Sequence, residues 1–159
     1  QAERWKPDAI FVDVGNIGGA VIDRLRQLKL DNVFEVNFGG TGGVVEWDAG
    51  MHVKTANKRS EIWTSMRSWL MRGGVIPDEQ QLEDDLTGVE YTYGEGETAI
   101  LLERKRDMKK RGLSSPDWGD ALATTFAMPV APRVPRHKDP LAHIPMGGAA
   151  HHDRYSELS

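Results

Sequence analysis

Two aspartates in otherwise apolar segments are the residues best suited to chemistry. Asp13 lies in DAIFVDVGNIGG, inside a run of β-forming residues that predicts a strand covered on both faces. Asp120 lies in SSPDWGDALATTFA, which predicts a helix with Ser115 as its N-cap and with enough apolar residues to be buried. A carboxylate is costly to bury without a partner. Each aspartate therefore needs either a structural or a functional partner.

Carboxylates without cysteine or histidine nearby are hard oxygen ligands, which suit Mg²⁺ or Mn²⁺ better than zinc. Two such cations can activate a water and stabilise the leaving oxygen when a phosphodiester is cleaved. Asp117 lies three residues before Asp120 and shares its helix face. The sequence leaves open which of these two is the direct ligand, and whether Asp13 binds metal or caps the glycine turn that follows it.

A basic cluster precedes the helix that carries Asp120. It consists of Arg104, Lys105, Arg106, Lys109, Lys110 and Arg111. Such a run is usually a solvated face, but next to carboxylates it predicts contacts with a phosphate backbone. A smaller basic patch is expected at Lys54, Lys58 and Arg59.

Alternating apolar segments and turns predict an α/β fold. A strand at 9–14, a helix at 17–28 and a strand at 33–38 form a βαβ unit with parallel strands. The glycines at 15, 18 and 19 do not have the spacing of a dinucleotide fingerprint. The remaining expected elements are a glycine-rich loop at 39–50, an aromatic-faced helix at 56–72, a short acidic helix from Pro77, and a hairpin of 89–93 with 98–103.

The bulk composition is that of a soluble globular domain. The net charge is −4, so DNA binding would depend on local basic patches or on bound cations. There is no cysteine and no apolar run long enough to cross a membrane. Residues 129–159 are rich in proline and histidine, which predicts a domain at 1–128 followed by a C-terminal tail.

Several segments, taken in order, resemble the C-terminal nuclease domain of the terminase large subunits of tailed bacteriophages. They are DAIFVDVGNIGGAVIDRL, VFEVNFGG, NKRSEIWTSMRSWL, GGVIPD and ILLERKRDMKKRGLSSPDWGDALATTFA, and the resemblance covers about residues 8 to 128. It implies an RNase H-like fold, with a central mixed sheet flanked by helices on both faces. It also implies a metal-dependent endonuclease that cleaves concatemeric double-stranded DNA during genome packaging by two-metal phosphodiester hydrolysis.

In this resemblance Asp13 matches the family's strand-end acidic ligand, and Asp120 matches the acid of its last helix. The implied cofactor is Mg²⁺ or Mn²⁺. The implied partners are double-stranded DNA, an upstream ATPase domain, the terminase small subunit and the portal, in the cytoplasm of the infected bacterium.

The sequence departs from the family in one respect. The family has a further catalytic aspartate on the first strand of the fold, and no residue here matches it. The first strands are therefore expected upstream of Gln1, and the 159-residue chain is expected to hold an incomplete metal site. The rival hypothesis is a non-catalytic RNase H-like module that binds DNA or docks to a partner.

Overall fold

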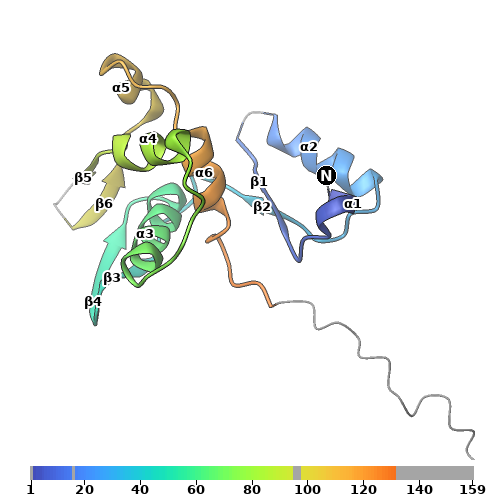
Figure 1. Ribbon diagram of the computed structural model, residues 1–159, viewed down its shortest axis with the longest axis horizontal. Coiled ribbons are helices and arrows are strands. Elements are labelled where there is room, and N and C mark those ends of the chain that lie inside the picture. The colour runs from blue at the N-terminus through green and yellow to red at the C-terminus, as the bar shows by residue number, and fades with distance from the viewer. Residues whose placement is uncertain (1, 16, 95–97, 132–159) are drawn as a thin grey trace, which may run out of the picture.

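The computed structural model describes residues 2–15, 17–94 and 98–131 (Figure 1). Most of the predicted tail, 132–159, lies outside the described residues. Within the described part, no helix is long and apolar enough to cross a membrane. The helices and strands in chain order are α1 (Ala2–Trp5), β1 (Ile10–Asp13), α2 (Gly18–Gln27), β2 (Val33–Val36), β3 (Val44–Asp48), β4 (Met51–Thr55), α3 (Lys58–Met71), α4 (Gln80–Gly88), β5 (Tyr91–Tyr93), β6 (Ala99–Leu102), α5 (Lys105–Lys110) and α6 (Asp117–Thr124).

The predicted βαβ unit is confirmed. β1 pairs with β2 in parallel, from Ile10 opposite Val33 to Asp13 opposite Val36, and α2 connects them. Gly18 starts α2 directly against the end of β1, because a Cβ atom there would lie 1.9 Å from the carbonyl oxygen of Asp13. A larger residue at this position would push the helix away from the strand.

The other four strands form a mixed sheet in the order β3-β4-β6-β5. β4 and β6 are parallel, whereas the β3–β4 and β5–β6 pairs are antiparallel. The predicted hairpin of β5 with β6 is confirmed. The prediction of a loop at 39–50 is wrong for Val44–Asp48, which forms β3, and Gly50 at φ +77° makes the turn into β4.

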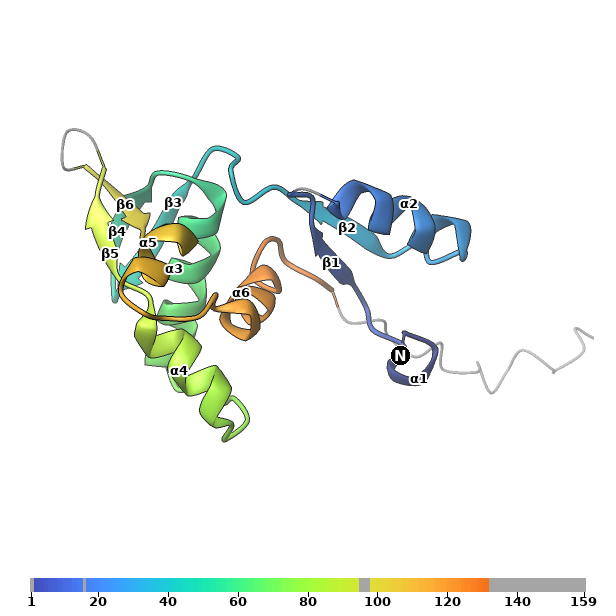
Figure 2. The same ribbon diagram turned by 90° about the horizontal axis from the view of Figure 1, so that it is seen from above.

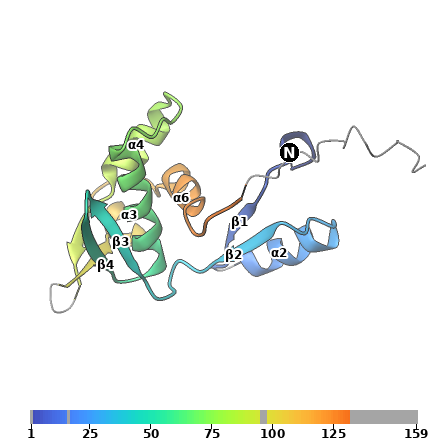
Figure 3. The same ribbon diagram turned by 90° about the horizontal axis from the view of Figure 1, so that it is seen from below.

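The expected α/β class, with a mixed sheet flanked by helices, is confirmed. The described strands form two sheets, and α6 lies between them (Figure 2). α6 contacts α3 and α4 on one side and β1 on the other. Figure 3 shows the same arrangement from below. The buried core joins β2, α3 and the α6 region through Val36, Ile62, Trp63, Met66, Ala123 and Ala127.

Candidate active site

Asp120 is a buried charge at the centre of a polar cluster. It lies in the first turn of α6 and is only 5% exposed. Its Oδ1 accepts hydrogen bonds from Arg59 Nε at 2.9 Å and from Trp63 Nε1 at 2.8 Å. Lys105 Nζ lies 2.8 Å from Oδ2, although that oxygen accepts no hydrogen bond within the described residues. Two positive charges therefore compensate this carboxylate.

The two cations beside Asp120, Arg59 and Lys105, differ in their exposure to solvent. Arg59 is 9% exposed, and its Nη1 also donates to the carbonyl oxygen of Glu103 at 2.9 Å. The Lys105 side chain is 42% exposed and lies 3.4 Å from Asp117. Burial lowers the pKa of Lys105, but its contacts with Asp120 and then Asp117 outweigh this and raise that pKa above its ordinary value. Lys105 is therefore a charged ammonium at neutral pH.

A carboxylate from another helix fixes the start of α6. The predicted N-cap Ser115 is wrong, because Pro116 occupies the cap position and the position has no side-chain cap hydrogen bond. Instead Asp85 of α4, itself 3% exposed, accepts hydrogen bonds from the amides of Trp118 at 2.8 Å and Gly119 at 3.1 Å. These are amides of the first turn, which α6 cannot satisfy internally. Asp85 therefore caps α6 from a different helix, in place of a side chain at the N-cap position.

Close packing restricts the size of the residue at position 119 of α6, which is Gly119. A Cβ atom on Gly119 would lie 2.8 Å from the indole of Trp63 and 3.3 Å from Cβ of Asp85. Gly119 thus lets α6 approach both α3 and α4. This approach brings Asp120 within hydrogen-bond reach of Arg59 and Trp63 on α3.

Asp13 is exposed at the carboxyl end of β1. Its Oδ1 accepts a hydrogen bond from the amide of Gly15 at 3.0 Å, which is the capping role that the sequence allowed. β1 packs against α6, the helix that carries Asp120. Asp13 and Asp120 thus lie on contacting elements, but the carboxylate of Asp120 itself faces Arg59 and Trp63 of α3. Metal binding by the two aspartates together stays a prediction.

The two aspartates have the donor chemistry of a Mg²⁺ or Mn²⁺ site, since both offer hard carboxylate oxygens. The buried Oδ2 of Asp120 accepts no hydrogen bond within the described residues, but Lys105 Nζ lies 2.8 Å from it, so a metal ion would bind this oxygen only in place of Lys105. No cluster of three or more histidine, aspartate or glutamate side chains that could hold a metal ion forms among those residues. The described donors thus fit a divalent cation in type, but they make up only part of a ligand set.

Asp117 and the basic cluster occupy the surface around this site. Asp117 has a side chain 74% exposed and pairs with Lys105. Arg111 hydrogen-bonds Glu103 through Nε at 2.9 Å and the carbonyl oxygen of Gly88 through Nη2 at 2.8 Å. Other cluster members pair with Asp107, which lies 2.7 Å from Lys110 Nζ and 3.8 Å from Arg106 Nε. The DNA-binding role of the cluster stays a prediction.

Two partners of Asp120, Arg59 and Trp63, were not expected from the sequence. Arg59 was expected in a small surface patch with Lys54 and Lys58, but it is buried and points to α6, and Lys58 pairs with Glu61 at 2.6 Å. Arg59 and Trp63 are four residues apart on α3 and therefore share a face. Nothing in the sequence of this helix identified Asp120, 61 positions from Arg59, as their shared partner.

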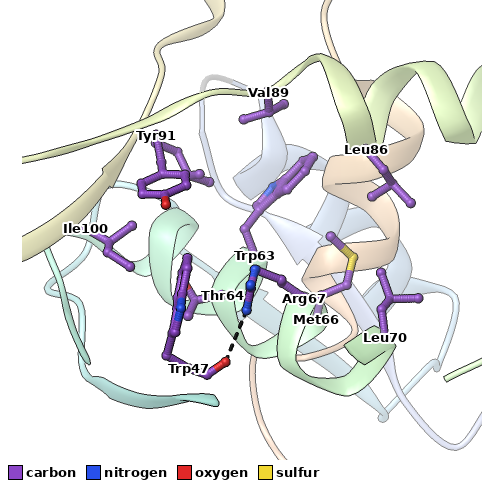
Figure 4. Close-up of a pocket in the computed structure, with 11 residues that line it drawn as sticks. Trp47, Trp63, Thr64, Met66, Arg67, Leu70, Leu86, Val89, Tyr91 and Ile100 are labelled. Carbon is purple, nitrogen blue, oxygen red and sulfur yellow. Dashed lines mark hydrogen bonds between the residues drawn. The ribbon is translucent and has the colours of Figure 1, made fainter. Parts of the chain in front are cut away.

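An aromatic cavity lies on the other side of Trp63 (Figure 4). It has a volume of about 300 Å³ and is bordered by α3, α4 and the mixed sheet. Arg67 stacks over Trp47, with its guanidinium carbon 3.9 Å from the ring centroid, and Tyr91 meets Trp47 edge to face. None of its lining residues is a carboxylate. This cavity therefore lacks the ligands of the expected metal site, which lies around Asp120.

Comparison with known proteins supports the expected fold. No protein-family model and no curated protein matches the sequence. Among solved structures, the chain is similar to a mutant nuclease domain of the large terminase subunit gp2 of bacterial virus Sf6, determined with manganese. The TM-score is 0.56 and the sequence identity 17%, over 80% of this chain and 69% of that one. The resemblance to a terminase nuclease domain is thus confirmed at the level of the fold.

Proposed function

We propose that this chain cleaves double-stranded DNA as the nuclease domain of a viral DNA-packaging enzyme, with Mg²⁺ or Mn²⁺ held by Asp13 and Asp120. The observation that carries the proposal is Asp120, a buried carboxylate on a helix that two other helices hold in place. Its support is the fold shared with a protein described as a terminase nuclease domain with manganese.

The residues around Asp120 have separate tasks in this proposal. Trp63 and Arg59 hold Oδ1, which fixes the direction of the carboxylate. Oδ2 is the oxygen that would serve as a ligand, and Lys105 must withdraw from it for that to happen. When bound, a divalent cation lowers the pKa of a water and stabilises charge on the phosphate. Asp117 would support the site by holding Lys105 nearby.

The basic cluster would hold the substrate. Arg104 and Lys109 are exposed, and their side chains form no ion pair or hydrogen bond with the described residues. They are the cluster members whose charge remains available for DNA phosphates. The wider role follows from the resemblance: concatemeric DNA as substrate, an ATPase domain, a small subunit and a portal as partners, and action in the cytoplasm of the infected bacterium.

A supercoiled-plasmid assay with Mn²⁺ tests the proposal, run on a longer version of the chain that supplies the acid expected on the first strand and that cleaves as wild type. Asp120→Asn keeps an oxygen for Arg59 and Trp63 but removes the charge that a cation needs. Loss of a metal ligand should lower the cleavage rate by at least about 100-fold, more than loss of a supporting partner would. Asp117→Asn is the comparison variant, because it removes an exposed carboxylate that supports the site only through Lys105, and it should lower the cleavage rate less than Asp120→Asn does. Equal cleavage by the Asp120 variant and the wild type would remove Asp120 from the site.

One observation favours the rival, a non-catalytic module that binds DNA. Both oxygens of Asp120 already face cations of this chain, so the carboxylate has a structural explanation. A longer version of the chain, which supplies the acid expected on the first strand, distinguishes the two functions. Cleavage by that version supports the nuclease, whereas DNA binding without cleavage by either version supports the rival.

A further inference from the structure

A second cavity lies beside the Asp120 cluster and is lined by cations from two distant segments. Its volume is about 300 Å³. The segment that leads from β6 into α5 contributes Glu103, Arg104 and Lys105, and the start of α3 contributes Arg59. The rest of its wall comes from the loop after β2, the residue before α3 and the end of β6, namely Phe38, Gly39, Asn57, Leu101 and Leu102.

The charges around this cavity favour an anion. The one carboxylate among its lining residues, Glu103, is already hydrogen-bonded to Arg111, at 2.9 Å for one of its oxygens. Arg104 is exposed, and its side chain has no hydrogen bond or ion pair with the described residues. The guanidinium of Arg59 has a further buried nitrogen, Nη2, that makes no hydrogen bond within those residues. A buried donor without a partner is costly, so an acceptor that reached it would be stabilised.

The volume suits a phosphate group with its waters. A water takes about 30 Å³ in the liquid, so the cavity holds on the order of ten waters or a phosphate with several of them. A planar guanidinium binds phosphate through two parallel hydrogen bonds, and an adjacent ammonium adds a point charge. Arg104 and Lys105 supply these two kinds of donor from neighbouring positions in the chain.

We infer that the Arg59–Arg104–Lys105 cavity binds one phosphate of a DNA backbone. The inference deepens the proposed function and rests on it for the identity of the ligand. Lys105 also contacts Asp120, so the phosphate would lie next to the carboxylate that we propose as a metal ligand. The cavity would then fix the position of the DNA strand along its length relative to Asp120, because phosphate contacts position a protein on nucleic acid.

An NMR titration tests whether the cavity binds phosphate. EDTA is present to remove divalent cations, so that DNA is not cleaved. Inorganic phosphate and a short DNA duplex are added separately to the 159-residue chain, while the Arg59 Nε–H signal and the backbone amides of Gly39, Arg104 and Lys105 are followed. Both ligands should shift these signals saturably, the duplex at lower concentration. Arg104→Gln should weaken the binding of phosphate by about tenfold, the effect of one charged hydrogen bond.

Arg24→Gln is the matched control, because Arg24 is an exposed arginine on α2, outside the basic cluster, and does not line the cavity. It should leave the phosphate affinity within about twofold of the wild type, since its charge is screened and distant. Arg59→Gln is avoided as the main variant, because it also removes a partner of Asp120. The inference is overturned if neither ligand shifts these signals, if both variants weaken phosphate equally, or if phosphate shifts them and the duplex does not. Cleavage by the intact enzyme is a separate measurement, so the nuclease proposal does not fall with this one.

Discussion

The carboxylate of Asp120 and the guanidinium of Arg59 form an ion pair in which the two side chains are 7% and 11% exposed. Removing one member of a buried pair leaves the other charged and unpaired, which costs more than the pair itself contributes. Asp120 is thus important to the stability of the fold as well as to the proposed chemistry. The two roles can be separated by the choice of substitution.

Asp120→Ala should lower the free energy of unfolding by about 3 kcal/mol or more, because it leaves Arg59 and the indole N–H of Trp63 without their acceptor. Asp120→Asn keeps that acceptor and should cost clearly less. Urea denaturation of both variants measures the difference. Asp117→Ala, at an exposed position of the same helix, should change stability by no more than about 0.5 kcal/mol. Equal stability of the alanine variant and the wild type would contradict the buried pair.

At the scale of residues, the sequence indicated where a buried charge lies but not what compensates it. Asp120 stands out because a carboxylate in an apolar helix needs a partner. Arg59 is 61 positions away in the chain, and nothing local to either residue identifies the other. For Asp13 the sequence could not choose between two roles, because an aspartate at the end of a strand can be a metal ligand or can cap a turn. The structure shows the capping hydrogen bond.

At the scale of elements, the start of α6 depends on α4. Asp85 accepts the amides of Trp118 and Gly119, and Gln81 of its own helix donates to its other oxygen at 2.9 Å. Helix α6 therefore cannot keep its place if α4 moves. This link explains why an acidic segment of the sequence contributes a fully buried carboxylate.

Asp85→Ala should destabilise the protein by about 2 kcal/mol, because it removes a helix cap and leaves first-turn amides unsatisfied. Hydrogen exchange at the amides of Trp118 and Gly119 should accelerate more than at amides elsewhere in the core. Asp85→Asn retains an acceptor oxygen and should recover part of both effects. Asp84→Ala, an exposed neighbour on α4, serves as the control. Unchanged exchange at Trp118 in the Asp85→Ala variant would show that α6 does not need this cap.

Arg111 joins β6 to the end of α5 in a way that depends on pH. Its hydrogen bond to Glu103 is the main cause that holds the pKa of Glu103 below its ordinary value of 4.5. A carboxyl group whose pKa is lower in the folded state stabilises the fold above its unfolded pKa, and this stabilisation is lost as the pH falls through the folded pKa. The contribution of this pair should therefore be present at pH 7 and diminish as the pH falls below the ordinary pKa of the group.

Arg111→Gln should raise the pKa of Glu103 towards its ordinary value, as followed by NMR titration of the glutamate side chain. The stability gap between the wild type and this variant should be wider at pH 7 than near pH 3. Lys109→Gln is the control, because Lys109 is exposed and pairs with no described residue. A gap that stays constant over this range would assign the effect of Arg111 to its bond with the Gly88 carbonyl instead.

Local patterns predicted most elements, and competing signals explain the errors. The βαβ unit follows from a short apolar run, a helical repeat and a second run, all within one continuous stretch. The strand β3 was missed because the flanking glycines of 39–50 are typical of a loop, while Val45 and Trp47 alternate too briefly to outweigh them. The cap at Ser115 was wrong because Pro116 takes the cap position and a distant helix supplies the acceptor.

At the scale of the molecule, α6 lies between the parallel pair β1–β2 and the four-stranded sheet, where it contacts β1 and the helices α3 and α4 (Figure 2). The proposed ligands Asp13 and Asp120 lie on opposite sides of this contact, one on β1 and one on α6. A site divided between two elements in this way forms only in the folded state. The sequence could name both acids, but only the packing of α6 against β1 relates them in space.

The position of a bound cation tests the central claim most directly. Crystals of the protein soaked in Mn²⁺ give an anomalous signal that locates the ion without reference to any assumed site. We expect one ion coordinated by carboxylate oxygens of both Asp13 and Asp120, with Lys105 moved away from Oδ2 and no such ion in Asp120→Asn crystals. A Mn²⁺ ion bound elsewhere, with Lys105 still paired to Asp120, would contradict the proposed site.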